Sequence, residues 1–522
     1  MYDRQSGTIW IGKSGDKKVS IYPSMANRHG MICGATGTGK TITLKVMAES
    51  FSDMGVPVFL ADVKGDLAGF CMPGKDSEDM QARIQRFGLK EAGFSYDSYP
   101  ANYWDVYGEK GMNLRTTVSE MGPLLLSRIL GINDTQTDVL SIIFKIADDN
   151  NMLLIDTKDL KAMLNYVADH NKEYASEYGN VAKQSVNAII RSIVALEGEG
   201  ADQFFGEPAL SISDWMTGSS GKGTIQILDC QKLINKPNMY ATFLLWMMSE
   251  LFETLPEVGD AEKPKMVFFF DEAHMLFDDA PKALLSRIEQ VVKLIRSKGV
   301  GIYFVTQNPK DIPDAILAQL GNKIEHALHA YTPAEQKSVK AAAMSFRENP
   351  AFDTYDTILS LGTGEALVSV LDEKGVPTIV EKTSILPPQS LIGPIDDSTR
   401  ESEIRSSMLF SRYNDFFDRD SAYEFLQRNQ SLAENADEVP AGNTPTPAQG
   451  TAQTAKPKVD KNSLEYKTRK AAQSTAKTAA GTVGREVGKT MGNAIGGKFG
   501  KTLGGNIGAS LGRNVLGVFF KS

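Results

Sequence analysis

A glycine-rich octapeptide near the start of the chain constrains its fold more than any other feature. Residues 34–41 read "GATGTGKT" and fit the pattern G-x-x-x-x-G-K-[ST]. The apolar run "GMIC" precedes it, the helical pattern "KTITLKVMAESFSDMG" begins within it, and a second apolar run, "VPVFLAD", follows. A strand, a loop, a helix and another strand form a βαβ unit. The sequence therefore predicts an α/β fold with a mostly parallel sheet.

The same octapeptide is suited to binding phosphate. Gly37 and Gly39 allow the backbone to wrap with its N–H groups pointing inward, and the helix N-terminus adds positive potential. Lys40 would reach the β- and γ-phosphates of a nucleotide, and the Thr41 hydroxyl would bind Mg²⁺. The alternative is a glycine-rich turn that binds nothing. The expected nucleotide-binding residues are Gly34, Ala35, Thr36, Gly37, Thr38, Gly39, Lys40 and Thr41.

The stretch "MVFFFDEAH" supplies acidic residues that complement this loop. Asp271 ends a run of buried apolar residues, where a charge is costly without a partner, and Mg²⁺ held through Thr41 is the natural one. Glu272 is placed to polarise a water for attack on the γ-phosphate, which favours an ATP hydrolase over a kinase. The alternative is an acidic pair that caps the next helix. His274 belongs to five scattered histidines and is expected to be structural.

Three further polar positions have two interpretations each. Gln307, in "FVTQNP", follows the strand after Asp271 and is either a γ-phosphate sensor or a loop amide capping the turn. Arg296, in "LIRSKGVG", is either an arginine finger for a neighbouring subunit or a cation at a helix C-terminus. The segment 62–66, "DVKGD", either couples the site to a partner or solvates a loop, and we favour the loop slightly.

The pattern along the chain predicts several regions around these motifs. Apolar spacing between residues 75 and 215 is helical, and strands resume at "GTIQILDCQKL". The predicted regions are a short N-terminal β segment (1–25), an ATPase core (26–395) that contains a mostly helical insertion (75–215), C-terminal helices (396–437), a flexible linker (438–470) and a basic glycine-repeat tail (471–522).

Charge and composition indicate a cellular compartment for the protein, but they leave two interpretations of its C-terminal tail. Three separated cysteines suit a reducing compartment, and the chain has neither the apolar run of a signal peptide nor that of a membrane span, so we expect a cytoplasmic protein. The net charge is −8, yet from residue 450 onward 13 basic residues face 3 acidic ones. Glycines recur there every fourth residue from Gly484 to Gly512. This tail is either a packing or membrane-interface helix or a poorly ordered basic segment.

Taken together, "ANRHGMICGATGTGKT", "DVKGDLAGF", "FFFDEAHMLF" and "GVGIYFVTQNPKDIP" resemble the HerA/FtsK superfamily of P-loop motor ATPases. The resemblance covers about residues 20–390 and is closest to a bacterial branch of HerA-like proteins described as helicases. It implies a RecA-like P-loop core, ring hexamers and ATP-driven translocation of double-stranded DNA. It also implies that Arg296 is a finger acting on a neighbouring subunit. Lys40, Glu272 and Gln307 keep the roles given above, as do the two metal ligands.

The leading hypothesis is therefore an oligomeric, Mg²⁺-dependent ATPase that moves on or remodels DNA. ATP hydrolysis is argued from residues, whereas DNA as the substrate follows from the resemblance. One alternative is a motor that moves proteins, like the coupling ATPases of type IV secretion, with the tail attached to a membrane. The other is a nucleotide-gated scaffold whose helical insertion recruits a partner. A partner nuclease or other protein is not identified by the sequence.

Overall fold

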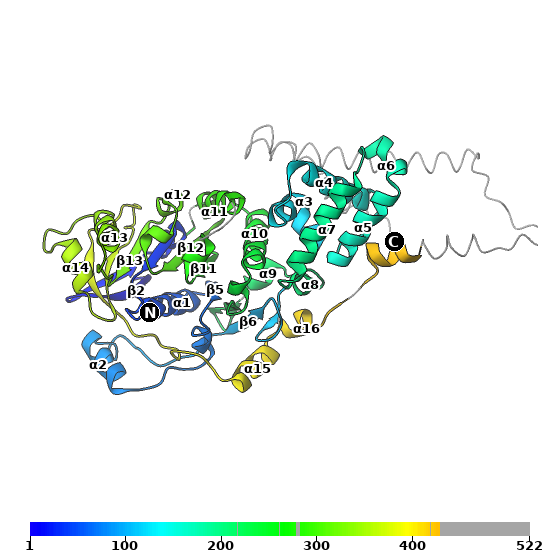
Figure 1. The fold of residues 1–522 in the computed structure, drawn as a ribbon. Helices are drawn as coiled ribbons and strands as arrows, with labels where there is room; N and C mark the ends of the chain where they lie inside the picture. The colour runs from blue at the N-terminus through cyan, green and yellow to red at the C-terminus, as the bar shows by residue number, and fades with distance from the viewer. Residues whose placement is uncertain (217, 260, 278–281, 418, 429–522) are drawn as a thin grey trace, which may run out of the picture. The chain divides into compact units, whose positions relative to one another are not determined.

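The computed structural model describes residues 1–428 apart from 217, 260, 278–281 and 418. A twisted sheet forms the middle of this part of the chain, and helices cover both of its faces (Figure 1). The glycine-repeat tail and the predicted linker lie outside the described residues. Among the helices that are described, none combines the length and the apolar character needed to cross a membrane.

The strands are short and most are buried. Their bounds are β1 Tyr2–Asp3, β2 Thr8–Ser14, β3 Lys17–Ile21, β4 Gly30–Cys33, β5 Val58–Asp62, β6 Ala101–Asp105, β7 Met112–Asn113, β8 Gly218–Ser219, β9 Lys222–Gly223, β10 Ile225–Asp229, β11 Met266–Phe270, β12 Val300–Thr306, β13 Asn322–His326, β14 Glu365–Ser369 and β15 Glu381–Ile385.

The helices fall between these strands and after them. Their bounds are α1 Lys40–Asp53, α2 Glu78–Phe87, α3 Val118–Ile129, α4 Asp134–Asp149, α5 Thr157–Asp169, α6 Asn171–Tyr178, α7 Lys183–Glu197, α8 Ala201–Phe204, α9 Ile212–Trp215, α10 Pro237–Thr254, α11 Lys282–Leu294, α12 Asp314–Leu317, α13 Pro333–Met344, α14 Thr354–Ser360, α15 Asp397–Ser406 and α16 Phe410–Tyr413. Short 3₁₀ segments include η4 Ala273–Leu276 and η5 Ile295–Lys298.

The sheet is parallel at its centre and antiparallel at one end. Its order is β1-β2-β15-β14-β13-β4-β12-β11-β5-β10-β6-β7, with β3 paired to β2. From β13 through β4 to β7, each strand is parallel to the next one in this order. From β13 through β14 to β1, each strand is antiparallel to the next. The predicted α/β fold with a mostly parallel sheet is confirmed, and its parallel strands present their carboxyl ends at one edge.

Strand β11 shows why the centre of the sheet needs cover on both sides. Its side chains alternate between two apolar clusters, with Phe268 and Phe270 in the cluster that holds α10 and α11, and Phe269 in the cluster that holds α1. Both faces are therefore buried, which accounts for an unbroken apolar run where an exposed strand would alternate with polar residues. On the α1 side, the Phe269 and Tyr303 rings stack with centroids 5.2 Å apart.

The predicted helical region 75–215 begins with α2 but also contains two strands of the main sheet, β6 and β7. Strand β6, within the predicted 75–215 insertion, pairs in parallel with β10 and extends the main sheet. The helices α3 to α9, which follow β7, contribute residues to the same apolar cluster as α10. Helical spacing alone did not reveal β6 because "ANYWD" has only five residues, too few for periodicity to assign well.

The N-terminal strands also belong to the main sheet and do not form a separate segment. β2 pairs with β15, with Lys13 opposite Ser384 and Gly12 opposite Ile385. Lys17, the first residue of β3, also contacts β15: its Nζ lies 2.6 Å from a carboxylate oxygen of Glu381, the first residue of β15. The predicted boundary between residues 25 and 26 thus separates two parts of one folded unit.

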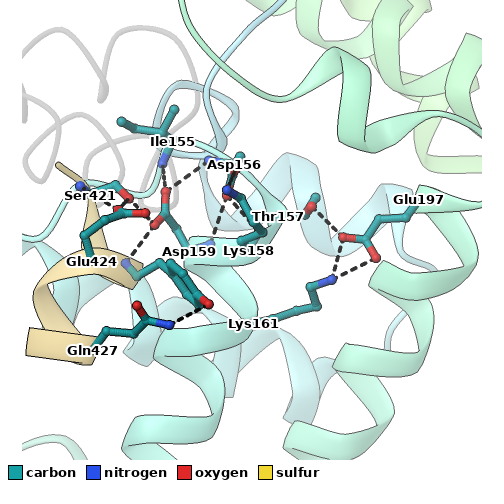
Figure 2. A network of polar contacts seen from close by, with 11 residues as sticks. Ile155, Asp156, Thr157, Lys158, Asp159, Lys161, Glu197, Ser421, Glu424 and Gln427 are labelled. Atoms are coloured by element: carbon teal, nitrogen blue, oxygen red, sulfur yellow. Dashed lines mark hydrogen bonds and ion pairs between the residues drawn. The ribbon is translucent and has the colours of Figure 1, made fainter. Parts of the chain in front are cut away.

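The buried carboxylate of Asp159 connects the last described residues to the helical region through hydrogen bonds. Figure 2 shows Asp159, in the first turn of α5, between the start of that helix and segment 421–428. Its Oδ2 accepts hydrogen bonds from Ile155 N (2.8 Å) and Asp156 N (3.2 Å), and its Oδ1 accepts from Ser421 Oγ (2.5 Å) and Tyr423 N (2.9 Å). One side chain therefore satisfies donors from two distant segments.

Replacing this carboxylate should destabilise the protein. Asp159→Ala leaves buried N–H donors of α5 and of segment 421–428 without partners, and each charge-assisted bond contributes about 1.5–3 kcal/mol. We expect a lower urea midpoint of unfolding. Asp169→Ala, also on α5, removes an exposed ion pair with Lys183 of α7 and should change the midpoint little. Equal midpoints for the two variants would contradict this role of Asp159.

Candidate active site

The glycine-rich loop connects the end of β4 to the start of α1 in a conformation that needs its glycines. Gly39 precedes the first helical residue with φ 117°, in the region that favours glycine. Gly34 has φ 149°, and a Cβ added there would lie 2.4 Å from His326 Cβ on β13. The loop therefore packs directly against the neighbouring strand, which leaves its N–H groups at the N-terminus of a 14-residue helix.

Backbone hydrogen bonds tie this loop to later parts of the chain. Ala35 N donates to Ala327 O, just after β13, at 2.8 Å. Gly364 N, in the turn before β14, donates to Thr38 O at 2.9 Å. Within the loop, Thr38 Oγ1 donates to Ala35 O at 2.7 Å. Residues 34–41 are thus held from β13 and β14 as well as from β4.

Lys40 and Thr41 occupy the first two positions of α1. Lys40 is buried and its Nζ donates to the carbonyl oxygens of Gly34 (2.6 Å) and Ala35 (3.0 Å), so the ammonium lies inside the curve of the loop. Burial lowers the pKa of Lys40, while the negative charge of Glu272 opposes that change. Thr41 is half-buried at the same helix end.

The strand order places the acidic pair and Gln307 beside this loop. Strand β12 lies between β4 and β11, so Gln307 leaves the sheet between the loop and Asp271. The position expected for Gln307 at this edge agrees with the geometry, and its Nε2 donates to Glu272 Oε2 at 3.2 Å. Its role toward a γ-phosphate stays a prediction.

Glu272 is held in a conformation that is rare for its residue type. Its backbone adopts φ 46° and ψ 49°, a left-handed geometry that costs on the order of 1–3 kcal/mol for a side chain of this kind. Glu272 is only 4% exposed. Such strain is often found at functional sites, and here it fixes the carboxylate at the carboxyl edge of the sheet, beside Gln307.

Lys64 is the residue at this edge whose importance the sequence did not reveal. The sequence slightly favours a loop-solvating role for segment 62–66, but in the structure Lys64 Nζ forms an ion pair with Glu272 Oε1. β5 adjoins β11, so the residues that follow these two strands meet at the same edge. Burial raises the pKa of Glu272, but the contact and charge of Lys64, together with the hydrogen bond from Gln307 and the charge of His274, lower it to below its usual value.

The residues present are suited to a magnesium ion carried by a nucleotide. Asp271 is 5% exposed, and burial together with the neighbouring Glu272 raises its pKa to about 6. A divalent cation would favour the ionised carboxylate and reverse this shift. No cluster of three or more metal-binding side chains occurs within the described ranges. Mg²⁺ is typically bound by one or two protein oxygens with phosphates and waters completing its shell, and Thr41 with Asp271 fit that pattern.

Arg296 lies far from the glycine-rich loop of its own chain. It belongs to η5, which precedes β12, whereas Gln307 follows the other end of the same strand. A seven-residue strand spans roughly 23 Å. The carbonyl oxygen of Arg296 accepts a hydrogen bond from Asn27 Nδ2 at 3.4 Å, at the amino edge of the sheet. Arg296 is therefore too far away to act on the nucleotide site of its own chain. The predicted arginine finger requires that it act on a neighbouring subunit.

A buried acid lies behind the loop. Glu325 on β13 is opposite Cys33 in the register of β4 and is 0% exposed. Among the described residues neither of its carboxyl oxygens has a hydrogen-bond partner, and burial raises its pKa to about 8. The next residue, His326, contacts Thr43 Oγ1 of α1 through its Nε2 at 2.9 Å. The residues of β13 that lie behind the glycine-rich loop are therefore uncharged, and their surroundings are mostly apolar.

The buried acid predicts a pH-dependent stability. The folded protein keeps the Glu325 proton up to pH 8, whereas the unfolded chain releases it near the ordinary value of 4.5, so wild-type stability falls as pH rises through that window. Glu325→Gln cannot ionise, so its urea midpoint relative to wild type should rise across the same window. Glu373→Gln, at an exposed position, is the control. A constant difference between wild type and Glu325→Gln would contradict the assignment.

Comparisons with known proteins identify the family of this chain. Residues 9–510 match the family described as Helicase HerA-like C-terminal. The DNA double-strand break repair helicase HerA of Sulfolobus acidocaldarius is 22% identical over 400 residues, 72% of this chain and 69% of that protein. Its counterpart from Sulfurisphaera tokodaii is 21% identical over 370 residues, covering 69% and 66%.

Among solved structures, VirB4 of Thermoanaerobacter pseudethanolicus is 18% identical, with a TM-score of 0.46, and the match covers 72% of this chain and 96% of that one. The family match covers nearly the whole sequence and confirms the resemblance carried by the four motifs. The chain belongs to the HerA-like helicase C-terminal family and is a P-loop ATPase.

Proposed function

We propose that this chain is a Mg²⁺-dependent ATP hydrolase that works as an oligomeric motor on double-stranded DNA. The observation that carries the hydrolase assignment is the position of Glu272, a buried carboxylate in a left-handed conformation that shares one sheet edge with Lys40 and Gln307. This arrangement supplies a phosphate cradle, a general base and a polar group between them.

Each residue of this edge has a distinct part in the proposed reaction. The N–H groups of residues 34–41 and the Lys40 ammonium bind and orient the phosphates. Thr41 and Asp271 would hold Mg²⁺, which when bound neutralises charge on the phosphate oxygens. Glu272 accepts a hydrogen bond from the attacking water, and Gln307 orients that water or senses the γ-phosphate. Water attack breaks the bond between the β–γ bridging oxygen and the γ-phosphorus and yields ADP and phosphate.

DNA as the substrate is supported by the family and by the names of its relatives. Both HerA relatives are described as DNA double-strand break repair helicases, and they match 72% and 69% of this chain, respectively. Motors of this kind act by coupling hydrolysis in one subunit to a neighbour, which is why we include an oligomer in the proposal. The acidic body of the chain requires any DNA contact to use localised basic residues.

The central test is ATP hydrolysis with and without double-stranded DNA. Removal of a general base typically lowers kcat by about 100-fold or more, so Glu272→Gln should be nearly inactive but still bind nucleotide. Glu289→Gln, an exposed glutamate on α11 paired with Lys293, is the matched control and should retain wild-type activity. Full activity in Glu272→Gln would refute the catalytic assignment.

The DNA part of the proposal is tested in the same assay. We expect double-stranded DNA to stimulate wild-type hydrolysis at low salt, and the stimulation should decrease as salt rises because phosphate contacts release counterions. Hydrolysis that DNA leaves unchanged at low salt would remove DNA from the proposal while leaving the ATPase assignment intact.

The role of Arg296 can be tested by mixing two inactive variants. Arg296→Ala keeps its glycine-rich loop, and Lys40→Ala keeps its arginine, so each should be inactive alone. If Arg296 acts on a neighbouring subunit, mixed oligomers contain interfaces with both groups intact, and activity should partly return. A mixture no more active than its components, under conditions in which mass spectrometry detects mixed oligomers, would exclude an arginine finger at this position.

A further inference from the structure

The loop that follows β5 is shaped so that Lys64 reaches the neighbouring strand end. Asp62 is 2% exposed, and its carboxylate accepts hydrogen bonds from Gly65 N (2.7 Å) and Leu67 N (3.1 Å). Its carbonyl oxygen accepts from Cys230 N at 2.9 Å, which fastens the loop to the end of β10. The backbone on both sides of Lys64 is therefore fixed, and only its side chain is free to change position.

Both carboxylate oxygens of Glu272 already have partners. Oε1 is paired with Lys64 Nζ. Oε2 accepts from Gln307 Nε2 at 3.2 Å and lies 3.3 Å from His274 Nδ1. A general base must direct an oxygen lone pair toward the attacking water, and a carboxylate that shares charge with an ammonium is a weaker acceptor for a water proton. The observed contacts thus oppose the task assigned to Glu272.

The two partners of this ion pair differ in their freedom to separate. The Glu272 side chain is 5% exposed and its backbone is held between the end of β11 and η4. The Lys64 side chain is 43% exposed, so much of it already contacts solvent and its movement buries no new charge. Breaking the pair by moving Glu272 would instead leave a buried charge without a partner, which is costly. Lys64 is the partner that can move.

We propose that Lys64 is a positioning residue that restrains Glu272 and keeps basal ATP hydrolysis slow until the lysine side chain leaves the carboxylate. This inference rests on Glu272 being the general base of the proposed function. It assigns regulation to the segment 62–66, between the strand end at Asp62 and the nucleotide site. Loss of the lysine should therefore accelerate hydrolysis, whereas a lysine that stabilised the transferring phosphoryl group would slow it when removed.

The test compares kcat and KM for ATP, without DNA, in wild type, Lys64→Met, Lys64→Gln and Lys64→Arg. A partly exposed ion pair contributes up to about 1 kcal/mol, so kcat of the Met and Gln variants should rise about two- to fivefold with KM unchanged. Lys64→Arg retains the cation and should stay near wild type. Lys145→Met, which removes an exposed pair with Asp149 on α4, is the control for loss of a surface lysine.

Two outcomes would overturn the proposal. A kcat in Lys64→Met and Lys64→Gln that is equal to or below wild type means that Lys64 does not restrain the base. An increase that survives in the double variant Lys64→Met/Glu272→Gln means that the effect does not pass through Glu272. Failure of the proposed function is recognised separately, because in that case the single variant Glu272→Gln is itself active. Thermal unfolding of each variant verifies that the comparison involves folded protein.

Discussion

Parallel pairing of four neighbouring strands is the constraint on which the site depends. Strands β4, β12, β11 and β5 run in the same direction and side by side, so their carboxyl ends open at one edge. The polar residues that follow them are separated by up to 267 positions in sequence, from Lys40 to Gln307. Because both faces of these strands are covered, the edge is the place where polar groups can gather without exposing the core.

Much of this edge could be predicted from short stretches of sequence. The glycine-rich loop, its strand and its helix are contiguous, and each glycine or lysine has a local reason to be there. Asp271 and Glu272 were recognisable because an acidic pair directly follows an apolar run. Gln307 could be placed because it ends the next strand along the chain. These predictions required only local pattern and the rule that parallel strands share a carboxyl edge.

Other features depended on information that no local pattern contains. The ion pair of Lys64 with Glu272 requires β5 to adjoin β11, and chain order does not give spatial order. No local sequence pattern marks Glu325, and only the pairing of β13 with β4 shows that it lies buried beside Cys33. Strand β6 was missed because it is short and is followed by a long helical region. In each case, tertiary contact decided what the local sequence left undetermined.

The long-range contacts of the sheet and the glycine-rich loop determine when these parts can fold during translation. Ala35 needs the carbonyl of Ala327, and Thr38 needs the N–H of Gly364, so a growing chain carries an incompletely supported loop until those residues emerge. β2 pairs early with its sequence neighbours β1 and β3, but it joins β15 only when residues 381–385 have been synthesised. Contacts of such sequence separation form slowly because the intervening chain must first be ordered. A nascent chain therefore completes the contacts that support its nucleotide loop only after residue 364 has been synthesised.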